Sequence, residues 1–153
     1  RCTSRARTAT LSDREPAGPP RDRPAAARRE AGAAVAAAGA DINQATQDGG
    51  TPLFIACQYG RLECAQLLRD AGADINQADE EGCTPLYIAC QEGQLECTRL
   101  LLEASAAINQ AEESGGTPLF VACQEGQLEC VRLLLEAGAV IDQADEEGTT
   151  TLF

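Results

Sequence analysis

The sequence contains no histidine, lysine, tryptophan or methionine, and only 3% of its residues are aromatic. Histidine is the commonest general base and metal ligand, so its absence removes the usual catalytic triads and the usual zinc sites. The absence of lysine excludes a Schiff-base enzyme and a phosphate-binding loop that ends in lysine. No apolar run approaches the roughly 18 residues of a membrane-spanning helix. Any core must be built from leucine, isoleucine, valine, alanine and cysteine.

Charge is distributed unevenly along the chain. Residues 1–29 hold eight of the twelve arginines against three acidic residues, whereas the remainder holds four arginines against twenty-one acidic residues. An acidic body repels phosphates, so we expect no nucleic acid, no membrane, and a protein partner with a neutral or basic surface. Residues 1–24 are rich in arginine and proline and are predicted to be disordered, with a nucleic-acid-binding tail or a transit peptide as alternatives.

One phrase of 18 residues recurs every 33 residues. It reads TPLFIACQYGRLECAQLL from Thr51, TPLYIACQEGQLECTRLL from Thr84 and TPLFVACQEGQLECVRLL from Thr117, and TTLF starts a further copy at Thr150. Self-similarity at such a period is typical of repeat proteins. We predict a repeat domain over 25–149, and we interpret the chain as a piece of a longer protein. The domain comprises a degenerate repeat at 25–45 and full repeats at 46–78, 79–111 and 112–144. Residues 145–153 are interpreted as the truncated start of a further repeat.

Each full copy predicts two short amphipathic helices. In the middle copy Thr84 is a good N-cap, and Pro85 suits the first helical position because its missing N–H costs nothing there. Apolar residues follow at i, i+3 and i+4, first from Leu86 and again from Cys97, and Gly93 separates the two runs. Two such helices cannot bury their apolar faces alone, so the core is expected to form between stacked copies.

The segment 79–111, DEEGCTPLYIACQEGQLECTRLLLEASAAINQA, resembles the ankyrin repeat. The resemblance implies an all-α solenoid of stacked helix-turn-helix pairs with β-turn fingers. The family has a histidine at a position that is aromatic here, in Phe54, Tyr87 and Phe120. Packing of the aromatic ring must therefore replace the hydrogen bonds that the family's histidine makes to neighbouring backbone. Ser105 stands where the family has a capping glycine. A left-handed residue other than glycine costs about 1 kcal/mol, so we predict that the middle repeat is least stable at this junction.

Six of the eight cysteines fall in two columns on the predicted apolar stripes. We interpret them as small buried hydrophobic residues: Cys57, Cys90 and Cys123 in the first helices, and Cys64, Cys97 and Cys130 in the second. Thiolate metal sites and disulfides are alternatives, but the in-repeat spacing of seven is not that of a zinc site. Buried free thiols favour a reducing compartment, the cytoplasm or the nucleus. Cys83 lies in a finger and is expected to be an exposed, reactive thiol.

Acidic runs recur in the fingers, and asparagines recur after the second helices. We interpret the acids as a solvated rim, with calcium binding as an alternative that lacks a known ligand spacing. Asn43, Asn76 and Asn109 are expected to tie turn backbone. We therefore predict no catalytic, cofactor-binding or metal-binding residue, and no enzyme activity in these repeats.

The resemblance implies a non-catalytic scaffold that binds a protein partner through finger tips and the exposed face of the first helix. The alternative is the targeting arm of a larger enzyme or channel. Tyr59 is the strongest single candidate, because aromatic residues dominate binding hot spots. We expect a monomer in the full-length protein, but marginal stability for these three repeats alone. The candidate partner-binding residues are Asp48, Gln58, Tyr59, Glu80, Glu81, Cys83, Gln91, Glu92, Glu113, Ser114, Gln124 and Glu125.

Overall fold

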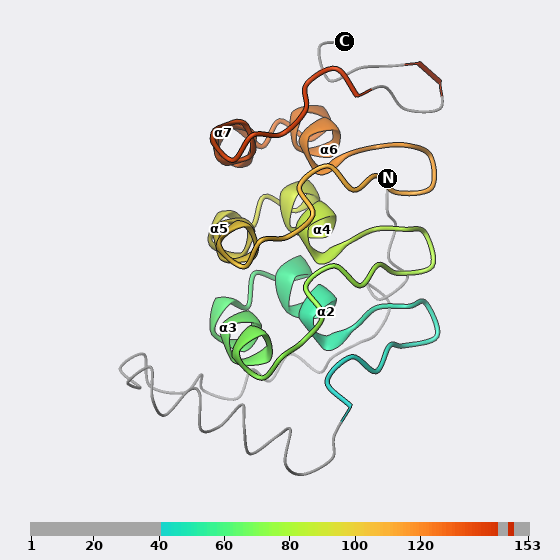
Figure 1. Cartoon of the computed structure of the whole chain (residues 1–153), viewed down its shortest axis with the longest axis vertical. Helices are drawn as coiled ribbons and strands as arrows, with labels where there is room; N and C mark the ends of the chain where they lie inside the picture. The colour runs from blue at the N-terminus through green and yellow to red at the C-terminus, as the bar shows by residue number, and fades with distance from the viewer. Residues whose placement is uncertain (1–40, 144–146, 149–153) are drawn as a thin grey trace.

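The computed structural model describes residues 41–143 and 147–148, which form six helices and no strand. The predicted all-α solenoid is confirmed, because three helix pairs stack in one direction (Figure 1). Apart from residues 41–45 and 147–148, the predictions for 1–45 and 145–153 lie outside the described residues. The pairs are α2 (Pro52–Gln58) with α3 (Leu62–Asp70), α4 (Pro85–Gln91) with α5 (Leu95–Glu103), and α6 (Pro118–Gln124) with α7 (Leu128–Glu136).

The first helix of every pair begins at the predicted threonine cap. The side-chain oxygen of Thr84 accepts a hydrogen bond of 3.2 Å from the N–H of Tyr87, and proline occupies the first helical position. Thr51 and Thr117 cap α2 and α6 in the same way. Each cap satisfies an N–H that an isolated helix end leaves unpaired, so the start of each repeat is fixed by its local sequence.

The second helix of every pair ends in a left-handed residue. Gly72 and Gly138 have φ of 90° and 89° after α3 and α7, and Ser105 has φ of 61° after α5. Among the described residues Ser105 is the one non-glycine residue with positive φ. Ser105 therefore has the left-handed backbone on which the predicted strain in the middle repeat depends.

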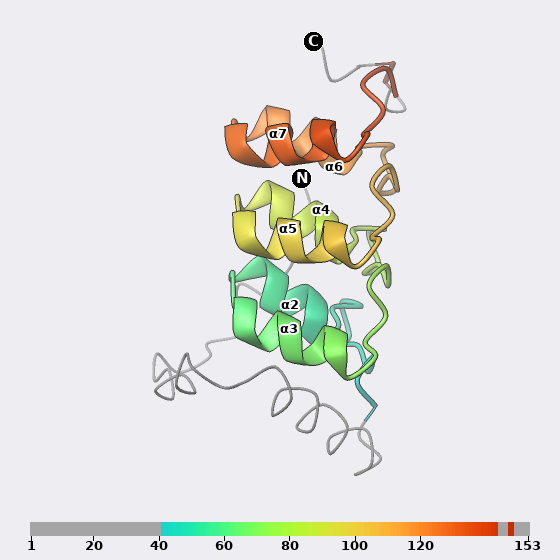
Figure 2. The same ribbon diagram turned by 60° about the vertical axis from the view of Figure 1, so that its left-hand side comes forward.

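The helices form two layers. Figures 1 and 2 show α2, α4 and α6 stacked beside the turns that project from the edge, and α3, α5 and α7 stacked in the other layer. The core lies between successive pairs, and Leu53, Leu86 and Leu119 occupy equivalent buried positions in it. A repeat therefore buries most of its apolar surface against its neighbours rather than against itself.

Asparagine side chains join each repeat to the next outside the core. The amide oxygen of each asparagine accepts a hydrogen bond from a backbone N–H that lies 31 residues later. These bonds are Asn43 with Asp74 at 2.7 Å, Asn76 with Ala107 at 2.8 Å, and Asn109 with Val140 at 2.9 Å. The prediction that the asparagines tie turn backbone is confirmed, and the ties connect separate repeats.

Candidate protein-interaction surface

Three fingers project from the stack, at residues 46–50, 79–83 and 112–116. In the middle finger the N–H of Asp79 donates to the carbonyl of Cys83 at 3.0 Å, and the N–H of Gly82 donates to the carbonyl of Asp79 at 3.1 Å. The Asp79 carboxylate also accepts from the N–H of Cys83 at 2.9 Å. Thr46 and Glu112 accept from Gly50 and Gly116 in the same way in the outer fingers. Three different side chains therefore close the same turn.

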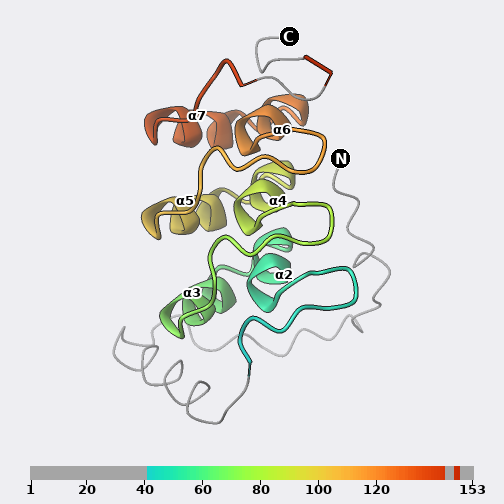
Figure 3. The same cartoon turned by 45° about the vertical axis from the view of Figure 1, so that its right-hand side comes forward.

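Backbone hydrogen bonds also link each finger to the next. The N–H of Glu80 donates to the carbonyl of Asp48 at 3.3 Å, and the N–H of Glu113 donates to the carbonyl of Glu81 at 3.0 Å. A Cβ at Gly49 would lie 2.7 Å from the nitrogen of Glu80, so the fingers approach too closely for another residue there. The fingers consequently form one row along the edge of the stack (Figure 3).

The tips of this row present acidic side chains. Glu80, Glu81 and Glu113 are exposed, and Asp48 is half-buried. We call these four residues the acidic rim. Ser114, another predicted contact, is exposed beside Glu113. These five predicted tip residues are therefore at least partly accessible to a partner, and their dominant chemistry is a row of hydrogen-bond acceptors with negative charge.

The two acid-closed fingers differ in their titration. Burial raises the pKa of Asp79, only partly offset by the hydrogen bonds from Cys83 and Glu81, and nearby acids raise it further. Burial also acts to raise the pKa of Glu112, but hydrogen bonds from Ser114 and Gly116 outweigh it and lower the pKa. A negative charge on the carboxylate that closes the turn is therefore less favourable in the middle finger than in the third.

The ring of Tyr87 lies beneath the third finger. A Cβ at Gly116 would lie 3.5 Å from the tyrosine oxygen. Burial raises the pKa of Tyr87, and the charges of Glu112, Glu125 and Glu81 raise it further. The tyrosine therefore remains a neutral phenol that fills the space below the next finger, as the packing role predicted for this position requires.

The first-helix part of the predicted surface is only partly exposed. Tyr59 is 40% exposed, and Gln124 is exposed. The expected exposure of Gln58 and Gln91 is wrong, because these side chains are 3% and 9% exposed. Gln58 and Gln91 each have a further helix pair stacked on them. The equivalent Gln124 lies in the last pair and has no described repeat after it. Glu92 and Glu125 are half-buried.

The cysteines also depart from expectation in part. Cys83 is fully buried and disulfide-bonded, so the prediction of an exposed, reactive thiol is wrong. The position closes the base of a finger, and its equivalents Gly50 and Gly116 are buried as well. Cys64 and Cys123, predicted to be buried, are exposed at the two ends of the described stack.

The described residues contain one group with the spacing of metal ligands. It consists of Asp79, Glu81 and Cys83, whose ligand atoms lie within 4.8 Å of one another. However, one oxygen of Asp79 already accepts from the N–H groups of Glu81 and Cys83 at 3.0 and 2.9 Å. Because the carboxylate closes the turn and the sulfur of Cys83 is in a disulfide, we assign no ion to this group.

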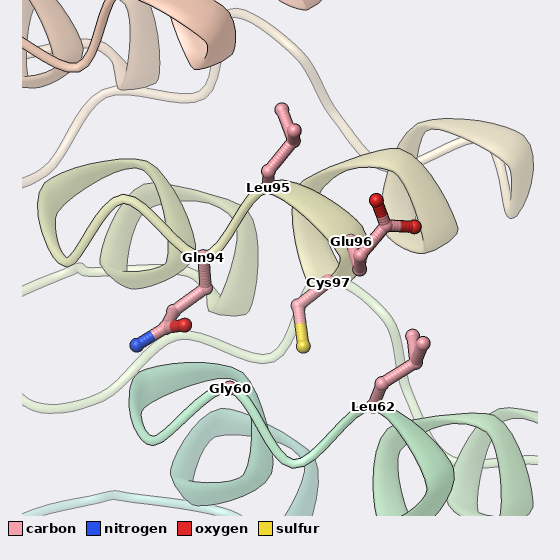
Figure 4. Close-up of a pocket in the computed structure, with 6 residues that line it drawn as sticks. All are labelled: Gly60, Leu62, Gln94, Leu95, Glu96 and Cys97. Atoms are coloured by element: carbon pink, nitrogen blue, oxygen red, sulfur yellow. The ribbon is translucent and has the colours of Figure 1, made fainter.

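Sequence reasoning missed a polar contact that joins the middle helix pair to the last one. The hydroxyl of Thr98 in α5 lies 4.0 Å from the sulfur of Cys90 in α4 and 3.8 Å from the sulfur of Cys130 in α7. Cys97 lines a cavity of about 300 Å³ together with Gly60, Leu62, Gln94, Leu95 and Glu96 (Figure 4).

Comparison with known families gives one match, described as ankyrin repeats (3 copies), over residues 25–112 and 105–153. The matched residues make up well over half of the chain. No curated protein matches the chain. None of the described helices is long and apolar enough to cross a lipid bilayer.

Proposed function

The chain belongs to the ankyrin repeat family, whose members are generally protein-interaction modules, and we propose that it binds a basic protein surface without catalysing a reaction. The observation that carries this proposal is the acidic rim. Its four residues lie in one row, which the bonds between fingers hold in place. A row of fixed negative charges favours a partner that presents lysine or arginine at a similar spacing.

The basic residues of the described chain lie away from the rim. The fingers and first helices contain no arginine or lysine. Arg99 and Arg132 lie on the second helices, 3.9 Å from Glu96 and Glu129 of the same helix. The acidic rim is therefore not neutralised by cations of its own elements.

Tyr59 supplies an exposed aromatic ring at the end of α2 opposite to the finger that precedes this helix. It is 40% exposed at the end of α2, where Glu92 and Glu125 stand in the later repeats. A rigid aromatic ring of this kind contributes more to binding than a surface carboxylate does, because its contact area is apolar. We therefore infer that a partner contacts the rim with basic residues and Tyr59 with an apolar one.

A charge-matched pair of variants tests the proposal. Fluorescence anisotropy would measure binding of a labelled arginine-rich peptide to the unsubstituted chain, to Glu80→Gln/Glu113→Gln, and to Glu103→Gln/Glu136→Gln. Both variants remove two exposed negative charges, the first from the rim and the second from α5 and α7. We expect the rim variant to bind roughly fivefold more weakly, since each surface charge contributes about 0.5 kcal/mol, and the helix variant to bind almost as before.

Two results would overturn the proposal. Equal weakening in both variants would mean that the peptide senses only net charge. Failure of the unsubstituted chain to bind arginine-rich or lysine-rich peptides at low salt would exclude a basic partner for the rim.

A further inference from the structure

Cys83 carries a covalent link whose partner follows from the cysteine count. It is disulfide-bonded, whereas the six other cysteines of the described residues are free. The sequence contains eight cysteines, so within the chain only Cys2 remains as the partner. Cys2 lies outside the described residues, in the arginine-rich segment that opens the sequence. A bond between these two cysteines connects that segment to the middle finger.

Cys83 lies at the centre of the finger row. Its N–H donates to the carboxylate of Asp79 at 2.9 Å, and its carbonyl accepts from the N–H of Asp79 at 3.0 Å, so it closes the base of the middle finger. This finger bonds to both of its neighbours, through Glu80 to the first finger and through Glu81 to the third. A segment attached at Cys83 is therefore held beside the acidic rim.

The attached segment has the opposite charge to the rim. Residues 1–12 contain Arg1, Arg5 and Arg7 and no acidic residue. An extended chain covers about 3.3 Å per residue, so Arg5 and Arg7 can reach about 10 Å and about 17 Å from Cys2. Packed helices lie about 8–10 Å apart, so neighbouring fingers are separated by about the same distance. The arginines therefore have enough chain to reach carboxylates in more than one finger.

We propose that residues 1–12 dock on the acidic rim of their own chain, held by a disulfide between Cys2 and Cys83, and that they compete there with the basic partner. The inference rests on the proposed function, because it gives the rim an internal occupant that limits access to the same site. Arginine suits this role, since its guanidinium forms paired hydrogen bonds with a carboxylate.

The disulfide sets how strongly the segment competes. A short link to the rim raises the effective concentration of the arginines to about the millimolar range, so that weak surface ion pairs suffice for docking. Without the bond, the arginines are joined to the fold only through the longer stretch 8–45. Their effective concentration at the rim then falls by on the order of tenfold.

The bond opens and closes by exchange with small thiols. A dithiol attacks one sulfur as its thiolate, the S–S bond breaks, and the second thiol of the reductant displaces the remaining cysteine. The two protons of the dithiol pass to Cys2 and Cys83, and the dithiol becomes a disulfide. Oxidised glutathione drives the reverse exchange and leaves as two thiols. Such bonds are transient where thiols are kept reduced, so we expect the rim to be released there.

Peptide mapping of the full chain tests the link. The chain is treated with oxidised glutathione, its free thiols are alkylated, and trypsin cleaves after arginine without prior reduction. Mass spectrometry should find a peptide that ends at Arg5 and carries Cys2, joined to the peptide 70–99 through Cys83, and dithiothreitol should release both. An alkylated Cys83, or a bond from Cys83 to any other thiol, would overturn the proposal.

Peptide binding tests the docking. Fluorescence anisotropy would measure binding of a labelled arginine-rich peptide to the oxidised chain and to its variants. We expect Cys2→Ser to bind the peptide up to about tenfold more tightly and Arg5→Gln/Arg7→Gln roughly fivefold more tightly, because each change weakens the internal competitor. The control Arg99→Gln/Arg132→Gln removes the same charge from the second helices and should bind almost as before.

The outcomes separate this inference from the function on which it rests. Equal peptide affinity for the oxidised chain, Cys2→Ser and Arg5→Gln/Arg7→Gln would overturn the self-docking, while the rim would still bind a basic peptide. An equal gain in the control variant would mean that only net charge matters, and would overturn it as well. Absence of peptide binding by every form would overturn the proposed function and the self-docking with it.

Discussion

The middle and last helix pairs contain one identical segment in two different environments. The residues CQEGQLEC occupy both 90–97 and 123–130. Cys90 and Gln91 are buried in the middle pair, whereas Cys123 and Gln124 are exposed in the last pair. Leu95 packs against the core, whereas its equivalent Leu128 is 61% exposed. In a solenoid, burial is therefore decided by the presence of a neighbouring repeat rather than by the local sequence.

A charge placed in this shared segment should separate the two environments most strongly. Cys90→Asp would bury an unpaired carboxylate between α4 and its neighbours, at a cost of about 4 kcal/mol or complete loss of folding. Cys123→Asp should change the stability by no more than about 0.5 kcal/mol, because its side chain faces solvent. Urea unfolding followed by circular dichroism would measure both. Similar losses in the two variants would contradict the comparison.

Removal of the asparagine ties should give a smaller difference. Asn76→Ala leaves the part-buried N–H of Ala107 without its acceptor, for a loss of about 1.5 kcal/mol. Asn109→Ala should lose less, since the N–H of Val140 is exposed and water can replace the amide oxygen. Asn76→Asp keeps an acceptor and serves as the control in the same urea titration. A loss at Asn109 as large as that at Asn76 would show that exposure does not set the cost.

The left-handed residues after α5 and α7 are a serine and a glycine, so each can be replaced by the other. Ser105→Gly should raise the free energy of unfolding by up to about 1 kcal/mol, because glycine adopts a φ of 61° without strain. Gly138→Ser should lower it by a similar amount, since a Cβ there meets no atom within 4 Å and only the backbone is strained. Thermal unfolding of both variants would measure the exchange. A loss of stability in Ser105→Gly would mean that the middle junction is not strained.

The stability contributions of the middle and third fingers should change with pH in opposite directions, and these effects should be smaller than those above. Because the fold raises the pKa of Asp79 above its ordinary value near 4, the folded state holds this proton more tightly, and stability falls as pH rises through the raised pKa. Asp79→Asn keeps the acceptor for Cys83 and should remove that fall.

Glu112 behaves in the opposite way, since its pKa is lowered in the fold. Its contribution is present above the ordinary pKa of a glutamate and is lost as pH falls through the lowered one, so Glu112→Gln should remove a loss on acidification. Urea midpoints of each variant and of the unsubstituted chain, measured from about pH 3 to pH 7, would test both signs. The same direction of change in the two variants would contradict the assignment.

Several features could be predicted from the sequence because they depend on neighbouring residues. Thr84 caps α4 through an N–H three residues later, and the positive φ of Ser105 follows from its place after α5. The sequence predicted that the asparagines bond to turn backbone, but it did not show that each one bonds to the next repeat. The failures concern the burial of Gln58, Gln91 and Cys83 and the exposure of Cys64 and Cys123, which depend on packing that a repeat pattern does not specify.

The sequence by itself determined the period of the array, the start of each first helix, the break between helices and the acidic character of the fingers, because these follow from contacts within a few residues. The tertiary structure alone decided which members of each identical column are buried, how the fingers bond into one row, and which backbone N–H each asparagine reaches. Asn76 accepts from the N–H of Ala107 rather than from its own repeat, because stacking places the same junction of successive pairs side by side. The physical reason is that these contacts join residues 31 or 32 positions apart, and only the packed repeats bring such residues together.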